Sequence, residues 1–278
     1  MIDTTHIALN RVICPELGLE EFFKLTASSG LGKVELRNDL SGKGIVDEWS
    51  PSSVRELAAH YGIEIITINA LQKFNLVSMR TQLLEDLQQL IDLASSIRCP
   101  AIVLCPNNDP NDRRHMDQIR SETEENLRSF APLFEKSQLI GLVEPLGFPQ
   151  SSLGSLPTAM EIIRASGCNR FKVVHDTFHH YLGPDSLQSL RESYEIDYTG
   201  LVHISGVETD KPEEQYLDGD RVLVGPKDKL GSREQLRFLQ ELGYSGDVSF
   251  EPFSEKIQSL SAGKMADVIK ASVAYLNG

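Results

Sequence analysis

Residues 101–144 read AIVLCPNNDPNDRRHMDQIRSETEENLRSFAPLFEKSQLIGLVE, and this stretch decides the fold because it holds one complete structural repeat. The apolar runs Ala101–Cys105 and Gly141–Glu144 predict strands that are covered on both faces. Between them, Asp117–Lys136 has the pattern of a helix. A strand, a helix and a second parallel strand form the unit from which α/β barrels and doubly wound sheets are built.

The same alternation continues in both directions along the chain. Further predicted strands are His6–Asn10, Lys33–Arg37, Glu64–Asn69, Lys172–Asp176, Leu201–Ser205 and Asp247–Glu251. Further predicted helices are Leu19–Ser29, a helix beginning at Ser50-Pro51, Met79–Ser96, Pro157–Ser166, Pro184–Glu192, Ser232–Leu242 and Lys264–Leu276. Eight strands alternating with eight helices predict an α/β fold, a single (β/α)8 barrel domain spanning residues 1–278. An open doubly wound sheet is the alternative, but no Gly-x-Gly-x-x-Gly follows the first strand.

The composition is typical of a globular protein and argues against a nucleic acid as its partner. The chain has 27 Lys+Arg against 40 Asp+Glu, a formal net charge of −13, and a hydrophobic fraction of 40%. Such a fraction supplies a sizeable core. The acidic balance argues against a surface built for nucleic acid, since phosphates are neutralised by clustered Lys and Arg. We therefore expect a small-molecule substrate and neither a nucleic acid nor a membrane as partner.

The cysteines and the first residues indicate a cytoplasmic protein. The four cysteines (Cys14, Cys99, Cys105 and Cys168) form no Cys-x-x-Cys pair, so we expect reduced, buried thiols. The N-terminal MIDTTHIALN has neither the basic region nor the apolar core of a signal peptide, and no apolar run approaches the ~18–20 residues of a membrane span. The oligomeric state stays open, a homo-oligomer included.

Potential metal ligands close the last four predicted strands. They are Glu144, Asp176, His203 and Glu251, separated by 32, 27 and 48 residues. The C-terminal ends of barrel strands meet at one mouth, where active sites form. A single acid there often only caps the next helix, but three carboxylates converging without a cation would repel one another. We therefore expect these four residues to bind one divalent ion, Mn²⁺, Zn²⁺, Co²⁺ or Mg²⁺.

Seven motifs resemble a known superfamily over essentially the whole chain. They are HIALN (6–10), VELR (34–37), ITINALQKFN (66–75), VEP (143–145), VVHDTFHHY (173–181), VHISG (202–206) and FEP (250–252). Together they resemble the xylose isomerase-like TIM barrels. Within that superfamily they are most similar to the inosose (2-keto-myo-inositol) isomerases of bacterial inositol catabolism.

The resemblance implies a metal-dependent isomerase or epimerase of a keto-sugar or an inosose. It implies that Glu144, Asp176, His203 and Glu251 bind the metal and that Glu144 and Glu251 also form the acid/base pair. One glutamate would remove the proton from the hydroxyl-bearing carbon beside the ketone, which gives an enediolate. The other would reprotonate the intermediate from its own side, so that the carbonyl moves or a stereocentre inverts, depending on which oxygen takes the shuttled proton. We expect no redox cofactor.

Five further residues are candidates for substrate binding. The resemblance implies that His179 lies beside substrate or metal and that Arg221 is a substrate-loop arginine, the alternatives being a histidine at a helix start and a solvated charge. Asn10 and Asn69 close the first and third strands, where an asparagine binds a hydroxyl or merely forms a turn. Glu35 faces the same side as the arginine two residues later, which predicts internal ion pairing or a polar pocket.

The sequence departs from the family around the substrate more than around the metal. The family often has His-x-x-Asp at the seventh strand, whereas Ile204, Ser205 and Gly206 follow the histidine here. Residues 224–231 replace a compact Pro-Gly-x-Gly turn, and no arginine follows the Phe-Glu-Pro motif directly.

Other functions fit parts of the pattern. An inosose dehydratase or another keto-sugar epimerase would use the same metal and bases. An endonuclease IV-type repair enzyme needs a trinuclear zinc cluster with more histidines at strand ends, and this chain has seven histidines in all. A non-catalytic polyol-binding protein is disfavoured because binding alone does not require two glutamates at a metal.

Overall fold

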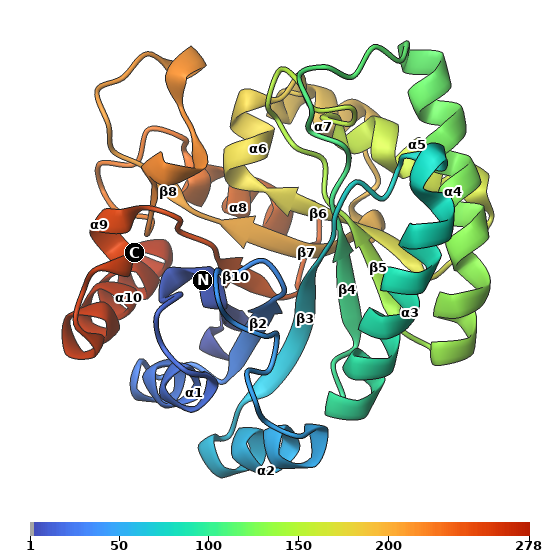
Figure 1. Ribbon diagram of the computed structural model, residues 1–278. Helices are drawn as coiled ribbons and strands as arrows, with labels where there is room; N and C mark the ends of the chain where they lie inside the picture. The colour runs from blue at the N-terminus through green and yellow to red at the C-terminus, as the bar shows by residue number, and fades with distance from the viewer. Residues whose placement is uncertain (1–2) are drawn as a thin grey trace.

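The computed structural model describes residues 3–278 and contains a closed parallel barrel (Figure 1). Its strands are β1 (Ile7–Asn10), β2 (Lys33–Arg37), β3 (Glu64–Leu71), β4 (Ala101–Leu104), β5 (Ile140–Val143), β6 (Phe171–Asp176), β7 (Thr199–Ile204) and β10 (Val248–Phe250). Each strand pairs with the next around the barrel, and β10 closes it by pairing in parallel with β1. The predicted (β/α)8 barrel is therefore confirmed.

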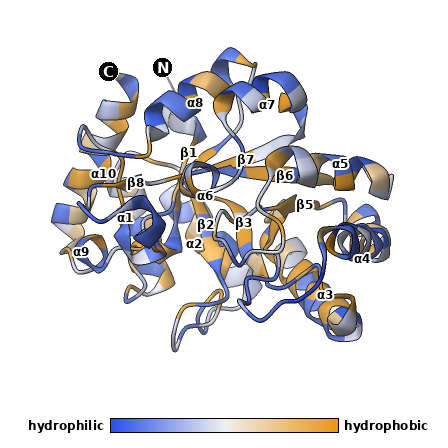
Figure 2. Cartoon of the chain, turned by 90° about the horizontal axis from the view of Figure 1, so that it is seen from above, coloured by the Kyte–Doolittle hydropathy of each residue, from blue (hydrophilic) through white to orange (hydrophobic). Residues whose placement is uncertain are grey.

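Helices surround the barrel (Figure 2). They are α1 (Leu19–Ser28), α2 (Pro51–Tyr61), α3 (Arg80–Ile97), α4 (Met116–Ser137), α5 (Leu156–Ser166), α7 (Leu187–Ser193), α8 (Ser232–Glu241) and α10 (Ala262–Asn277). Local sequence sets their ends: Ser50 caps α2 by accepting from the backbone N–H of Ser53, and Pro51 fills the first helical position. Gly62 ends α2 in the left-handed conformation. No helix among residues 3–278 is both long and apolar enough to cross a membrane.

Four short elements follow the C-terminal ends of strands and were missed by the sequence patterns. α6 (Thr177–Leu182) begins directly after β6, and α9 (Glu255–Gln258) precedes α10. β8 (Gly206–Val207) and β9 (Arg221–Val222) pair in antiparallel fashion after β7. Elements this short have too few residues to show a helical or strand period. They lie at the barrel mouth and carry part of the candidate site.

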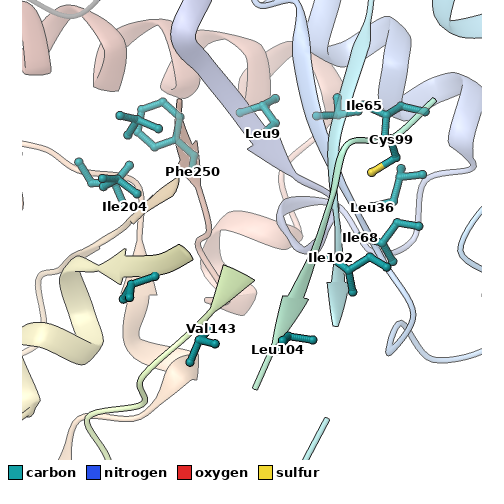
Figure 3. Packing of buried hydrophobic residues seen from close by; sticks show 14 of the residues in the cluster. Leu9, Leu36, Ile65, Ile68, Cys99, Ile102, Leu104, Val143, Ile204 and Phe250 are labelled. Carbon is teal, nitrogen blue, oxygen red and sulfur yellow. The ribbon is translucent and has the colours of Figure 1, made fainter. Parts of the chain in front are cut away.

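Side chains along the barrel strands alternate between two environments, as the period of two requires. One set packs against the helices and includes Leu9, Leu36, Ile68, Ile102, Leu104, Val143, Ile204 and Phe250 (Figure 3). The set that fills the barrel interior includes Ala8, Val103, Leu142, Val174 and Leu201. Two residues further along these strands, the interior side chains become Asn10, Cys105, Glu144, Asp176 and His203. Apolar side chains thus fill the barrel interior, and polar side chains form the next layer, at the C-terminal mouth.

The four cysteines are free and buried, as the sequence indicates. Cys14, Cys99 and Cys168 lie in the cluster that packs against the helices, and Cys105 lies in the interior cluster. Cys99 is drawn in Figure 3 among the aliphatic side chains. Burial raises the pKa of the Cys99 thiol to about 12, so this side chain acts as a small hydrophobic group.

Candidate metal centre and active site

The four predicted ligands converge on one point at the barrel mouth. One ligand atom from each of Glu144, Asp176, His203 and Glu251 lies within 4.8 Å of the others. Nδ1 of His203 is 2.6 Å from Oε1 of Glu144, 3.5 Å from Oε2 of Glu251 and 3.9 Å from Oδ2 of Asp176. Two ligands bound at about 2.1 Å to a tetrahedral zinc ion lie roughly 3.4 Å apart. The donor set, three carboxylates and one imidazole, therefore fits a single divalent ion in both chemistry and spacing.

Backbone geometry fixes where these side chains point. Asp176 pairs in register with His203 on the neighbouring strand and caps α6, its Oδ1 accepting from the N–H groups of Phe178 and His179 at 2.7 and 3.0 Å. Its Oδ2 is therefore directed to the mouth. Glu144 and Glu251 stand one residue beyond β5 and β10, and each donates its N–H to the adjacent strand at 3.0 Å. Both continue the strand direction, so their side chains face the barrel axis.

The carboxylate of Glu35 contacts His203 on the side of the ring that faces away from the other three ligands. Nε2 of His203 lies 3.1 Å from Oε2 of Glu35, and both side chains are fully buried. Glu35 also accepts from Thr67 Oγ1 and from Asn10 Nδ2. Burial works against its charge, but His203 and Thr67 outweigh burial and lower the pKa of Glu35 to about 2. An Nε2–H donated to this carboxylate leaves the Nδ1 lone pair directed at the other three ligands.

The charge on His203 depends on what lies at its Nδ1. Burial disfavours a protonated ring, but the carboxylates of Glu35, Glu251 and Glu144 outweigh burial and raise the pKa of His203 well above its ordinary value. The same carboxylates would attract a divalent cation to Nδ1 in place of a proton. The carboxylates at the mouth thus require a cation among them, either the protonated ring of His203 or a divalent ion.

The two glutamates of the expected acid/base pair have different surroundings. Oε1 of Glu251 accepts from Arg37 Nη1 at 2.7 Å and from the amides of Asn10 and Asn69 at 3.1 and 3.2 Å. Its Oε2 accepts from Arg221 Nη2 at 2.8 Å. Burial nonetheless raises the pKa of Glu251 to about 7, against the opposing effects of His203 and Arg221. Four donors therefore fix the orientation of this carboxylate.

Glu144 is held by fewer groups. Its Oε1 faces His203 Nδ1, and its Oε2 accepts a weak hydrogen bond from the Cys105 thiol at 3.5 Å. Cys105 ends the fourth predicted strand, and nothing in the sequence pattern distinguished it from the other buried thiols.

A cavity of about 210 Å³ borders these glutamates. Its walls include Asn69, His179 and Arg221, three of the predicted substrate-binding residues. Asn10 and Glu35 lie behind this wall, because both are fully buried and neither borders the cavity. Larger hollows of about 550 Å³ lie beside residues 4–6 and along α3, but they touch none of the four ligands.

His179 faces the cavity from α6. Its ring meets Phe148 edge-on with the centroids 5.1 Å apart, and burial lowers its pKa. The neighbouring His180 instead bonds to Gln235, as does His175. Of these three histidines, His179 alone borders the cavity.

Two arginines complete the mouth. Arg221 is 1% exposed, and its Nη2 also donates to Asp176 at 2.7 Å. Arg37 pairs through Nε and Nη2 with both oxygens of Asp39, each at 2.7 Å. Both guanidinium groups lie against the ring of Phe253: the distance to the ring centroid is 5.2 Å for Arg37 and 4.8 Å for Arg221. The sequence placed Arg221 at the site but did not single out Asp39 or Phe253.

Comparisons with known proteins agree with this geometry. A model of the xylose isomerase-like TIM barrel family matches residues 23–277. A xylose isomerase domain containing protein from Salmonella typhimurium LT2 is 37% identical, with a TM-score of 0.93 over 100% of this chain and 99% of that chain. The IolI protein, solved with a zinc atom bound, shares the fold with a TM-score of 0.87 and 21% identity over 98% of both chains.

Curated relatives carry isomerase names. The inosose isomerase of Halalkalibacterium halodurans is 25% identical over 202 residues, which cover 72% of this chain and 70% of that protein. The prediction of an isomerase-type enzyme is confirmed, since the curated relatives are named isomerases. Because the family match spans nearly the whole chain, the protein belongs to the xylose isomerase-like TIM barrel family.

Proposed function

We propose that the protein is a divalent-metal-dependent isomerase or epimerase of a keto-sugar or polyol ketone, with an inosose as the first substrate to test. The observation that carries this proposal is the convergence of Glu144, Asp176, His203 and Glu251 beside a small cavity. The names of the curated relatives support the choice of an inosose.

In this proposal Glu144, Asp176, His203 and Glu251 hold the ion. When bound, a divalent ion supplies a Lewis acid that polarises a ketone oxygen and the neighbouring hydroxyl. Glu35 keeps the His203 ring in the orientation that directs Nδ1 to the mouth. Arg221 shares the oxygens of Asp176 and Glu251, which is compatible with metal binding because an ionised carboxylate oxygen has two lone pairs.

Glu144 and Glu251 carry the proton in this proposal. One removes it from the carbon that bears the hydroxyl, which gives an enediolate. For isomerisation, the other returns a proton to the former carbonyl carbon while the hydroxyl proton passes from one substrate oxygen to the other; for epimerisation, it returns a proton to the original carbon from the opposite face. Both carboxylates border the cavity, so both can reach one bound ring. Glu251 is fixed by four donors, whereas the Glu144 oxygen that does not face His203 accepts only the weak bond from Cys105.

The predicted substrate-binding residues divide into two groups. Asn69, His179 and Arg221 border the cavity and are proposed to bind substrate oxygens. Asn10 and Glu35 have no surface there, and we assign them the role of positioning Glu251 and His203.

The test is product analysis in deuterated water. The protein loaded in turn with Zn²⁺, Mn²⁺, Co²⁺ or Mg²⁺ is incubated with 2-keto-myo-inositol and a ketose panel, and products are followed by NMR. The proposal expects an isomeric ketone that carries deuterium at the reacting carbon. An unsaturated dione would identify a dehydratase instead, and unchanged substrate with every metal would overturn the proposal.

A further inference from the structure

The proposed reaction leaves two aspartates at the mouth without a role. Asp39 and Asp218 border the cavity, and their side chains are 41% and 45% exposed, so a ligand can reach them. Each contacts one of the two arginines at the site. Their effect on those arginines determines which substrates the cavity can accept.

Four of the five N–H groups of Arg37 are already paired within the protein. Asp39 accepts from its Nε and Nη2 in a two-pronged ion pair, and Glu251 accepts from its Nη1 at 2.7 Å. The side chain is 5% exposed. Two carboxylates already pair with this guanidinium, so it has no pair of N–H groups left for bidentate binding of an anionic substrate group.

Arg221 is paired to the same extent, and one Nη1 proton remains for a substrate oxygen. Its Nη2 donates to Asp176 and Glu251, its Nε to Ser205 Oγ at 3.0 Å, and its Nη1 to Asp218 at 3.3 Å. Its two carboxylate partners at Nη2 are also metal ligands in the proposed function. Asp218 therefore adds a third carboxylate to this arginine, at the terminal nitrogen Nη1 that Asp176 and Glu251 do not contact.

The charge of the mouth is negative even with a metal bound. Six carboxylates (Glu35, Asp39, Glu144, Asp176, Asp218 and Glu251) stand against two guanidinium groups, so the formal charge is −2 with one divalent ion bound and −3 with a protonated His203 in its place. No lysine occurs among the described residues that border the cavity. An entering phosphate or carboxylate would meet this excess without a free cation to pair with.

Groups that suit hydroxyls are available instead. The cavity is bordered by the amides of Gln72 and Asn108, and Oδ1 of Asn108 is buried with no hydrogen-bond partner in the described part of the chain. A buried acceptor without a partner favours a ligand that donates, as a hydroxyl does. The exposed oxygens of Asp39 and Asp218 also accept hydroxyl protons.

We propose that Asp39 and Asp218 are specificity-determining residues, which make the site select uncharged polyol ketones and exclude carboxylated and phosphorylated ones. This inference rests on the proposed function, because it names the substrate class of the same cavity. It assigns the aspartates to substrate choice and not to proton transfer.

The test compares three ligands with one carbon skeleton: dihydroxyacetone, dihydroxyacetone phosphate and hydroxypyruvate. Their binding to zinc-loaded and to metal-free protein is measured by ligand-observed NMR titration. We expect the wild type to bind dihydroxyacetone at least about tenfold more tightly than either anion, and the preference to be greater without metal, since the mouth is then more negative. Comparable binding of the anions to metal-free protein would overturn the inference.

Single substitutions distinguish the effect of the two aspartates at the mouth from the effect of the net charge of the whole molecule. Asp39→Asn and Asp218→Asn should each reduce the preference by roughly threefold to tenfold, since each uncovers one arginine edge. Asp109→Asn is the matched control, because it removes the same charge from the loop after β4 at a residue that does not border the cavity. The inference fails if neither mouth variant changes the preference, or if the control changes it equally.

The two proposals can fail separately. Absence of deuterium exchange with every uncharged ketone would overturn the proposed function, while the binding preference would still be measurable. Exchange of ketones together with tight binding of the anions would overturn the specificity inference alone.

Discussion

The two ends of the barrel carry charges in different ways. At the C-terminal mouth, Glu35, Glu144, Asp176 and Glu251 have side chains no more than 4% exposed. At the opposite end, Lys33 forms ion pairs with Asp247 and Glu64, and Nδ1 of His6 lies 2.9 Å from Oδ1 of Asp247. The four side chains are 16–60% exposed. Buried carboxylates in excess over cations destabilise a fold, whereas partly hydrated pairs contribute little either way. The mouth therefore departs from what stability alone requires, which is expected of a functional site.

The largest effect should come from a proposed acid/base residue. Glu251→Gln keeps the size and one acceptor but cannot carry the proton, so solvent-deuterium incorporation into a bound ketone should fall by about a thousandfold or more. The barrel should stay folded, as checked by circular dichroism. Full exchange in this variant would remove Glu251 from the acid/base pair.

The next effect tests the support beneath the metal. Glu35→Gln replaces the charged partner of His203 Nε2, and the affinity for Zn²⁺ should fall by roughly tenfold to a hundredfold in a chelator competition. Glu64→Gln makes the same exchange at the opposite end and should leave the affinity unchanged. Equal losses in both variants would mean that overall charge, not the histidine contact, controls binding.

The pH dependence of stability should report on His175, a buried ring between β6 and Gln235 of α8, in contrast to the exposed end of the barrel. Burial and the adjacent His180 lower the pKa of His175 to about 3, so the folded protein keeps this ring neutral. Below about pH 6.5 the unfolded chain takes up the proton first, so stability falls as the pH drops through the window from 6.5 to 3.

The contribution of His175 can be isolated by substitution. Between pH 6.5 and 5 the ring accounts for about 2 kcal/mol of lost unfolding free energy. In His175→Gln that part of the loss should disappear, which urea titrations at the two pH values measure. An unchanged pH dependence in the variant would show that the ring is not held neutral.

The smallest effect belongs to the N-terminal end. Lys33→Met removes an ion pair to Asp247 whose side chains are 16% and 22% exposed. The free energy of unfolding should decrease by no more than about 1 kcal/mol, with kcat/KM unchanged. A loss of activity here would break the division between a functional mouth and a structural base.

The convergence of the four potential metal ligands could be predicted from the sequence because a strand period of two is a local property. Once Leu142, Val174 and Leu201 are assigned to the interior, Glu144, Asp176 and His203 follow as the next interior positions. The barrel then brings them together by parallel pairing. No loop conformation is needed for that step.

The rest of the site depends on features that have no local pattern. Asp39 and Asp218 reach the arginines through the conformations of βα loops, which residue type and spacing do not fix. The depth of a residue is also invisible in a strand period: Glu35 faces inward as predicted, but the stagger between strands places it beneath His203, away from the cavity.

The central claim is that four residues at the mouth hold one divalent ion. It is tested most directly by anomalous diffraction at the zinc edge from crystals of zinc-loaded protein. We predict one strong peak bonded to a carboxylate oxygen of Glu144, Asp176 and Glu251 and to Nδ1 of His203, not Nε2, with Nε2 still paired to Glu35. A structure without a peak at this position, or with zinc bound only elsewhere, would contradict the account.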